Sequence, residues 1–320
     1  MKPIVCALVG PTGVGKTRAA IRLCEALNAE IVSMDSMQVY RGMDIGTAKP
    51  TAQERQAARH HLIDIVDPEE TFTVASYRER AFEAFEDILS RDRLPLLVGG
   101  TGLYLQAVSF DMRLGESGAD EALREELRRV AEEIGGRERL HARLALADPQ
   151  SAARLHPNDV RRVIRAIEIA EHASQSKSEQ RDERREGPYR VLPYGLSLPR
   201  ERMYARIDAR VDEMIQDGLV AEVKMLLDQG VEPKDEGGAM QAIGYKEIVS
   251  ALRGEYTMDR AVALVKQGSR RYAKRQWTWF RHDPRVKWFD WTDYPAEDAL
   301  LSELEQTMRR DIAAAREQGE

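Results

Sequence analysis

The sequence predicts an α/β fold, in which a parallel sheet flanked by helices carries an all-helical insertion. Three observations support this prediction. An apolar run over residues 4–9 passes through a glycine-rich segment into a helix-forming run over 18–27. A second apolar run, over 94–98, also ends in a glycine turn, and strands followed by helices in this way are typical of parallel sheets. Charged amphipathic segments fill residues 115–187, which predicts the insertion.

The glycine-rich segment reads Gly-Pro-Thr-Gly-Val-Gly-Lys-Thr and matches G-x-x-x-x-G-K-[ST] between a strand and a helix, which predicts a P-loop NTPase-like core. Backbone N–H groups of such a loop converge on one anion, and the helix N-terminus adds partial positive charge. Lys16 is expected to contact the outer phosphate, and the Thr17 hydroxyl to bind Mg²⁺. The pattern leaves open which phosphate compound binds. The expected phosphate-binding residues are Gly10, Pro11, Thr12, Gly13, Val14, Gly15, Lys16 and Thr17.

Composition is that of an ordinary globular protein, because 42% of the 320 residues are hydrophobic and 32% are charged. No run approaches the ~20 apolar residues of a membrane span. The N-terminal apolar run leads into the phosphate loop rather than to a signal-peptide cleavage site. We therefore expect a soluble, cytoplasmic protein that has no membrane partner. Cys6 and Cys24 fall on a predicted strand and a predicted helix, which favours two core thiols over a disulfide.

Asp35 ends a short apolar strand over residues 30–35. The carboxyl ends of parallel strands line the ligand crevice of an open sheet, so Asp35 is expected near the phosphate loop. Its position alone leaves three roles open, namely a Mg²⁺ ligand, a helix cap and a general base. The segment 36–50 that follows has no clean period and is expected to form a loop or a short helix beside the site.

The remaining core elements follow from their apolar patterns. The adjacent His60 and His61 cannot face the same way on a regular element, which disfavours a metal site there. The strand that ends at Gly99 lacks the terminal acid usual in ATP-hydrolysing P-loop enzymes, which argues against an ATPase. The elements expected are an edge strand or extended segment over 62–66, a helix over 73–91, a strand over 190–197, one long helix over 200–229, a basic helix over 261–281 and a last strand over 286–291.

Two groups of basic residues indicate anionic ligands, although the net charge is −6. Arg202, Arg206 and Arg210 recur once per helical turn, and three guanidinium groups on one stripe suit a phosphate clamp. The segment 266–287 mixes basic residues with aromatic ones and holds one acid, Asp283, a composition that suits phosphate contacts and base stacking. Its basic residues are Lys266, Arg270, Arg271, Lys274, Arg275, Arg281, Arg285 and Lys287.

The middle of the chain is expected to form a separate helical domain. Residues 115–187 are assigned to this insertion, and residues 1–114 and 188–320 to the catalytic core. The polar stretch 174–186 has no periodicity and is expected to be a mobile loop. The expected helices cover residues 122–130, 140–144 and 157–169.

Six segments, in this order along the chain, resemble the tRNA dimethylallyltransferases, the bacterial tRNA isopentenyltransferase family. The long segment DSMQVYRGMDIGTAKP is far more specific than the phosphate loop, which many enzymes share. The resemblance implies transfer of a dimethylallyl group from dimethylallyl diphosphate to N6 of adenosine 37, beside the anticodon of tRNA. It also implies that the phosphate loop holds the prenyl diphosphate. The matching segments are 10–17, 35–50, 99–104, 158–162, 239–245 and 270–276.

The resemblance implies catalytic roles for individual residues. Asp35 would accept the N6 proton as the new C–N bond forms, and Thr101 would contact the adenosine opposite it. Lys16, the loop amides, Mg²⁺ on Thr17 and Arg210 would stabilise the leaving diphosphate, with Arg206 as a further candidate. The expected partners are therefore dimethylallyl diphosphate and the anticodon stem-loop of tRNA, and the protein is expected to act as a monomer.

The resemblance also implies an extended contact with tRNA, whose target base must leave the anticodon-loop stack to reach a buried site. Taken alone, the arginines near residue 162 fit a solvated helix face better than an RNA contact. The expected tRNA-binding residues are Asp35, Ser36, Met37, Gln38, Thr101, Arg124, Asp159, Val160, Arg161, Arg162, Val163, Gln241, Ala242, Ile243, Gly244, Tyr245, Lys246, Arg271 and Lys274.

Two other functions fit parts of the sequence. A small-molecule or nucleotide kinase would use ATP on the same loop, and Asp35 could then serve as its metal-binding acid. An RNA-binding, NTPase-like switch would use the basic helix over 261–281, but it would have no use for the specific segment after Asp35. Under the transferase interpretation, ATP binding at the loop is expected to be weak or irrelevant to turnover.

Overall fold

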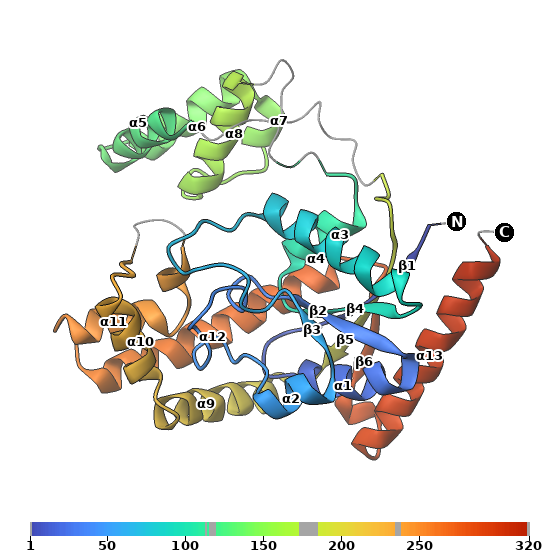
Figure 1. Cartoon of the computed structure of the whole chain (residues 1–320). Coiled ribbons are helices and arrows are strands. Elements are labelled where there is room, and N and C mark those ends of the chain that lie inside the picture. The colour runs from blue at the N-terminus through green and yellow to red at the C-terminus, as the bar shows by residue number, and fades with distance from the viewer. Residues whose placement is uncertain (1, 113, 115–119, 173–184, 234–237, 319–320) are drawn as a thin grey trace. The chain divides into compact units, whose positions relative to one another are not determined.

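The computed structural model describes residues 2–112, 114, 120–172, 185–233 and 238–318. Within these residues one sheet of parallel strands runs in the order β3-β2-β4-β1-β5-β6 (Figure 1). Leu62 and Asp64 have φ values of 62° and 58°, so the backbone cannot stay extended beyond His61, and the expected strand over 62–66 is wrong. The strands are β1 (Ile4–Val9), β2 (Ala29–Met34), β3 (His60–His61), β4 (Leu94–Gly99), β5 (Arg190–Ser197) and β6 (Lys287–Asp290).

Helices cover both faces of the sheet, because the buried side chains of β1 alternate between two clusters. Cys6 and Leu8 pack with α1, α9 and α13, whereas Val5 and Val9 pack with α3 and α4. The α/β fold expected from the sequence is therefore confirmed, and both cysteines are free core thiols. The bounds are α1 (Lys16–Leu27), α3 (Val74–Ser90), α4 (Gly102–Ser109), α9 (Arg200–Gln216), α12 (Met258–Arg281) and α13 (Glu297–Glu317).

A third cluster packs α10 and α11 against the segment that follows Asp35. The single helix expected over 200–229 is wrong, because Gly218 adopts a left-handed conformation at φ 104° and starts a new helix. This break lets α10 turn toward the segment 36–50, so it supplies part of the site described below. The bounds are α2 (Ala52–Ala57), α10 (Leu219–Asp228), η1 (Ala239–Gln241), α11 (Tyr245–Leu252) and η2 (Trp291–Asp293).

The chain divides into two compact units, Met1–Ser109 with Gly187–Glu320, and Phe110–Glu186. We call them the core unit and the helical unit. The helical unit starts at Phe110, ahead of the expected 115, and Phe110 pairs with Glu186 in an antiparallel bridge. Residues 174–184 of the expected mobile loop lie outside the described residues. No helix in the described ranges combines the length and apolarity that a membrane crossing requires.

The helical unit has its own small core. Buried side chains include Leu127, Leu140, Leu144 and Ile167. The carboxylate of Glu168 is fully buried and accepts hydrogen bonds from the N–H of Asp120 and from the Arg124 and Arg165 guanidinium groups. The helices are α5 (Glu121–Glu132), α6 (Gly136–Ala147), α7 (Pro149–Ala152) and α8 (Val160–His172).

Candidate active site

Three turns of the core unit start at the same level of the sheet, where three neighbouring strands end. Val9 at the end of β1 and Met34 at the end of β2 both align with Gly99 at the end of β4. The next residues are therefore the phosphate loop, Asp35 and the second glycine turn. A Cβ atom on Gly99 would lie 2.1 Å from the Met34 carbonyl oxygen, so a glycine is needed for this close approach.

The phosphate loop is held in shape by contacts from its own lysine and from the end of the sheet. The Lys16 Nζ donates hydrogen bonds to the carbonyl oxygens of Gly10 and Pro11, both at 2.8 Å. The Trp291 indole donates to the Val14 carbonyl oxygen at 2.7 Å. The Lys16 ammonium therefore lies inside the loop, at the N-terminus of α1, where an anion is favoured.

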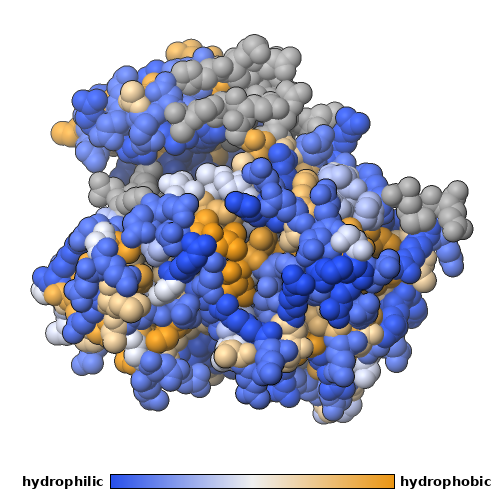
Figure 2. Space-filling view, viewed as in Figure 1, coloured by the Kyte–Doolittle hydropathy of each residue, from blue (hydrophilic) through white to orange (hydrophobic). Residues whose placement is uncertain are grey.

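A cavity of about 910 Å³ opens in front of this loop in the core unit. Figure 2 shows apolar residues gathered in the middle of the visible face of the core unit, with hydrophilic residues around them. Gly10, Pro11 and Val14 are buried in the loop and contribute no surface to the cavity. The expected site residues that line it are Thr12, Gly13, Gly15, Lys16, Thr17, Asp35, Gln38 and Arg210.

Asp35 presents one carboxylate oxygen to the backbone and the other to the site. Its Oδ1 accepts the N–H groups of Met37 at 2.8 Å and Gln38 at 3.3 Å. Among the described residues, no donor meets Oδ2. Burial raises the pKa of this carboxyl above its ordinary value, while the two N–H groups and Lys16 lower it. The backbone thus holds one oxygen of Asp35, as in a helix cap, and the other oxygen meets no donor in the described part of the chain.

The same surroundings shift the pKa of Lys16 in the direction opposite to that of Asp35. Burial lowers the pKa of Lys16 to about 7, although the charge of Asp35 raises it and that of Arg210 lowers it. A bound diphosphate would bring negative charge to the ammonium group and favour its protonated form. A bound diphosphate would therefore keep Lys16 in its charged form.

The second glycine turn places Thr101 beside Asp35. The Thr101 N–H donates to the Met34 carbonyl oxygen at 3.2 Å. Its hydroxyl is buried and has no hydrogen-bond partner among the described residues. It lies near the Tyr272 hydroxyl, whose pKa burial raises to about 12. Thr101 itself is not among the residues that line the cavity, whereas Gly100 and Tyr272 are.

Tyr272 and Gln276, on α12, line the cavity but were not among the residues expected at the site. Both face the second glycine turn from the same side of the helix, one turn apart. Their spacing in the sequence could have indicated a shared face. In the sequence, however, these two residues stand among basic residues, whose charge indicated phosphate contacts instead.

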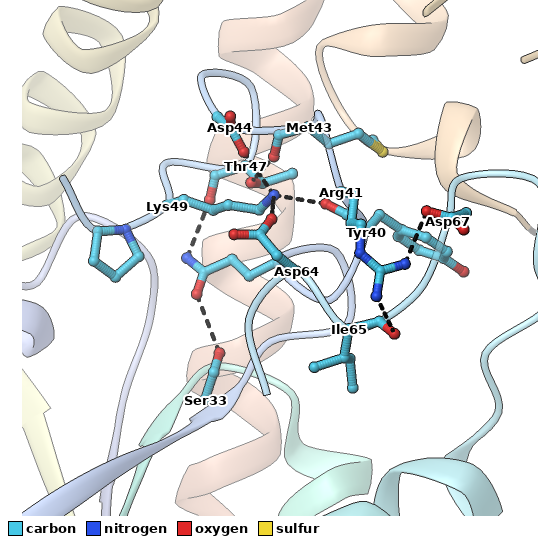
Figure 3. Close-up of polar contacts among 12 residues, drawn as sticks. Ser33, Tyr40, Arg41, Met43, Asp44, Thr47, Lys49, Asp64, Ile65 and Asp67 are labelled. Atoms are coloured by element: carbon cyan, nitrogen blue, oxygen red, sulfur yellow. Dashed lines mark hydrogen bonds and ion pairs between the residues drawn. The ribbon is translucent and has the colours of Figure 1, made fainter. Parts of the chain in front are cut away.

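The segment 36–50 is a loop rather than a helix, and polar contacts centred on the buried Lys49 hold it (Figure 3). The Lys49 Nζ donates to the Tyr40 carbonyl oxygen at 2.6 Å and pairs with Asp44 and Asp64. Gln38 accepts the Ser33 hydroxyl and donates to the carbonyl oxygens of residues 47 and 48. These contacts fix the loop along one side of the cavity.

Glu222 on α10 anchors the same loop from behind. Its buried carboxylate accepts the N–H groups of Asp44 and Ile45, both at 2.8 Å, and of Gly46 at 3.2 Å. It also accepts the hydroxyl of Tyr245, which is fully buried. The Tyr245 side chain thus faces the loop anchor and not solvent, and the expected contact of this residue with tRNA stays a prediction.

Substitution of Glu222 by alanine is expected to lower the free energy of unfolding by about 3 kcal/mol, because several buried donors would lose their acceptor. Glu222→Gln keeps an oxygen acceptor and should cost less. Urea denaturation of both, beside the exposed control Glu255→Gln, measures the effect. A loss below 1 kcal/mol in the alanine variant would show that the loop holds its shape without this anchor.

The other residues of the 241–246 segment divide by exposure. Ala242 and Gly244 are buried, and their expected contacts with tRNA stay predictions. Gln241 and Ile243 are half-buried, and Lys246 is exposed. Ser36 and Met37 are half-buried next to Asp35.

The arginine stripe on α9 does not act as one clamp. Both Arg206 and Arg210 are exposed, but Arg210 lines the cavity and Arg206 does not. Arg202 lies within electrostatic reach of Asp290 at the end of β6 instead. The three arginines therefore do not line the cavity together, because only the C-terminal half of α9 lies against it.

The basic segment 266–287 offers fewer cations to an anionic ligand than its composition indicates. Four of its eight cations pair with acids, and three of these acids lie on other elements. The pairs are Lys266 with Asp212, Arg270 with Asp208, Arg285 with Asp283 and Lys287 with Asp311. Arg271 and Lys274 are exposed and form no ion pair within the described ranges.

In the helical unit, the expected tRNA-binding residues differ in what they can offer. Arg124 pairs with Glu168 at 3.0 Å, and Val163 is fully buried, while their expected contacts with tRNA stay predictions. Arg161 is exposed at the start of α8, and Arg162 is exposed and pairs with Asp159 at 3.3 Å. Val160 is half-buried.

A comparison with known proteins identifies the family. The family model described as IPP transferase matches residues 38–283. The chain belongs to the IPP transferase family. The tRNA dimethylallyltransferase of Bacillus subtilis is 48% identical over 305 residues, which cover 95% of each protein. The resemblance found in the sequence is thereby confirmed.

Solved structures of the family agree with the fold. The full-length tRNA isopentenylpyrophosphate transferase from Bacillus halodurans matches with a TM-score of 0.75 at 44% identity and covers 99% of each chain. A eukaryotic dimethylallyltransferase, solved acting on tRNA, matches with a TM-score of 0.82 at 29% identity. That match covers 98% of this chain and 80% of the eukaryotic one. The P-loop NTPase-like fold is confirmed by these neighbours.

The donor set of this family member suits a Mg²⁺ ion held largely by its ligand. The described residues contain no group of three or more His, Cys, Asp or Glu side chains arranged to hold a metal. The cavity does present the Thr17 hydroxyl at the start of α1. Mg²⁺ commonly takes one or two protein oxygens and completes its shell with phosphate oxygens and water, so Thr17 fits.

Proposed function

We propose that the protein transfers a dimethylallyl group from dimethylallyl diphosphate to N6 of adenosine 37 in tRNA and releases diphosphate. The observation that carries the proposal is the cavity shared by an anion-binding loop and the half-buried carboxylate of Asp35, which has one unpartnered oxygen in the described part of the chain. Family membership supports it, as does the eukaryotic neighbour solved acting on tRNA. All side chains that the proposal invokes come from one chain, so it needs no second subunit.

The donor half of the reaction uses the phosphate loop. As the C1–O bond of the donor breaks, its electron pair stays on the diphosphate and positive charge develops on the allylic carbon. The loop N–H groups, Lys16 and Arg210 stabilise the departing anion, and such preorganised donors strongly favour a charged transition state. Mg²⁺ bound by Thr17 would supply further positive charge to the diphosphate.

The acceptor half uses Asp35 and Thr101. The N6 lone pair forms the new bond to C1, and the Asp35 Oδ2 accepts the proton that N6 loses. The Thr101 hydroxyl, which is buried without a partner among the described residues, donates or accepts a hydrogen bond at the adenine. The base must be extruded from the anticodon loop to reach these groups.

The tRNA backbone is proposed to contact the exposed side of α12. We expect Arg271→Ala with Lys274→Ala to weaken tRNA binding and to lower the slope of log affinity against log salt by about 1.5, since each lost phosphate contact removes roughly 0.7–0.9. Filter binding over a salt series measures both. Arg310→Ala with Arg316→Ala, which removes the same charge from α13, is the control. Equal slopes in the two double variants would exclude this surface.

The function is tested by incubating the protein with radiolabelled dimethylallyl diphosphate, unmodified tRNA and Mg²⁺ in the absence of ATP. Label on the adenosine beside the anticodon is expected. If no label is transferred and a small acceptor instead stimulates ATP turnover, the loop binds nucleotides and the kinase alternative is correct.

A further inference from the structure

Gln276 connects two of the three turns that form the site. Its Oε1 accepts the Thr12 N–H of the phosphate loop at 2.9 Å, and its Nε2 donates to the Gly100 carbonyl oxygen at 3.0 Å. The side chain is 5% exposed. One amide thus bonds the loop that follows β1 to the turn that follows β4.

The turn at Gly100 is shaped around this amide. A Cβ atom on Gly100 would lie 1.9 Å from the Gln276 Nε2, so any other residue there would displace the bridge. The next N–H in the chain, that of Thr101, donates to the Met34 carbonyl oxygen, one residue before Asp35. A continuous path of short contacts therefore runs from the phosphate loop through Gln276 to the carboxylate.

We infer that Gln276 is a positioning residue, which holds the donor diphosphate and the acceptor amine at the separation that the reaction needs. The inference rests on the proposed function. The phosphate loop fixes the leaving group, whereas Asp35 and Thr101 fix the amine, and these groups belong to different strands. Reacting atoms must approach to about 3–3.5 Å, and a misplacement of about 1 Å can cost about 10²-fold in rate.

The contacts of Gln276 are those of a positioning residue rather than of a catalytic residue. The hydrogen bonds of Gln276 to Thr12 and Gly100 go to backbone atoms. Its amide also neighbours the side chain of Tyr272, which lines the cavity. The Thr12 N–H is consumed by the bridge, so it is not part of the anion-binding set. Removal of the bridge should therefore leave donor affinity nearly intact while the chemical step slows.

The test compares Gln276→Met, which keeps the size of the side chain and removes both hydrogen bonds, with the exposed control Gln306→Met on α13. With tRNA and labelled donor in a single turnover, Gln276→Met is expected to react about 10²-fold more slowly. Its dissociation constant for a non-reactive donor analogue should change less than about 3-fold. The fraction of donor lost to water instead of tRNA should rise, since a misplaced amine captures the allylic carbon less often.

Other outcomes are distinguishable. If the wild-type protein transfers no label, the proposed function fails; if it does and both methionine variants match it, the inference fails. A lower melting temperature with an unchanged rate and unchanged hydrolysis would show that Gln276 is structural only. Should Gln276→Met not fold, Gln276→Glu decides, because it keeps the acceptor for Thr12 and loses the donor to Gly100. A wild-type rate in Gln276→Glu would overturn the proposal.

Discussion

Asp35→Asn is expected to lower the single-turnover rate of transfer by about 10²–10⁴-fold, because an amide oxygen cannot accept the N6 proton. The substitution preserves size, and the remaining oxygen can still accept the Met37 N–H, so the loop should keep its shape. Binding of tRNA and of the donor should therefore survive. Rapid-quench assays at saturating tRNA measure the chemical step, and filter binding measures the complex.

The exposed substitution Asp228→Asn serves as the control for this experiment. The pH profile adds a second measurement. Burial raises the pKa of Asp35, and only the ionised form accepts a proton, so the wild-type rate should fall as the pH drops through this raised value. Weakened tRNA binding with a normal chemical step in Asp35→Asn would rule out Asp35 as the base.

Lys16→Met should have the second largest effect, a loss of about 10²–10³-fold in kcat, because it removes the cation nearest the leaving diphosphate. The methionine keeps much of the side-chain length, but it cannot donate to the carbonyl oxygens of Gly10 and Pro11. Lys224→Met, an exposed substitution on α10, controls for the loss of one charge. A kcat within about 3-fold of wild type would show that the loop amides suffice.

The pH dependence of Lys16 separates binding from chemistry. In the ligand-free protein the pKa of Lys16 is about 7, so the ammonium form is lost as the pH rises above that value. Donor diphosphate favours the charged form, which means that binding takes up a proton. The kcat/KM for the donor should therefore fall above about pH 7, while kcat falls at higher pH. In Lys16→Met the fall of kcat/KM with rising pH should be absent.

The parts of the site that the sequence could predict are those built from neighbours along the chain. The phosphate loop is contiguous, and Asp35 and Thr101 directly follow strands whose apolar runs are plain. Because parallel strands end at one edge of the sheet, their proximity followed from fold class alone. No side-chain contact between distant helices was needed for these assignments.

The parts that could not be predicted depend on long-range packing. Tyr245 belongs to a segment that resembles the family and Val163 directly follows one, but such a resemblance does not tell which side chains face inward. The anchor Glu222 lies 178 residues from Asp44, so no local pattern joins them. The ion pairs of Lys266 and Arg270 with α9 likewise depend on how two helices cross.

The pairing of β1 has a consequence for how the protein is made. Ile4 aligns with Arg190 of β5, and the phosphate loop is contacted by Gln276 and Trp291 from near the other end of the chain. During synthesis β1 can therefore pair with β5 only after most of the chain has been made. Pairings between such distant segments slow folding. The nascent phosphate loop therefore lacks its contacts with Gln276 and Trp291 until translation is nearly finished.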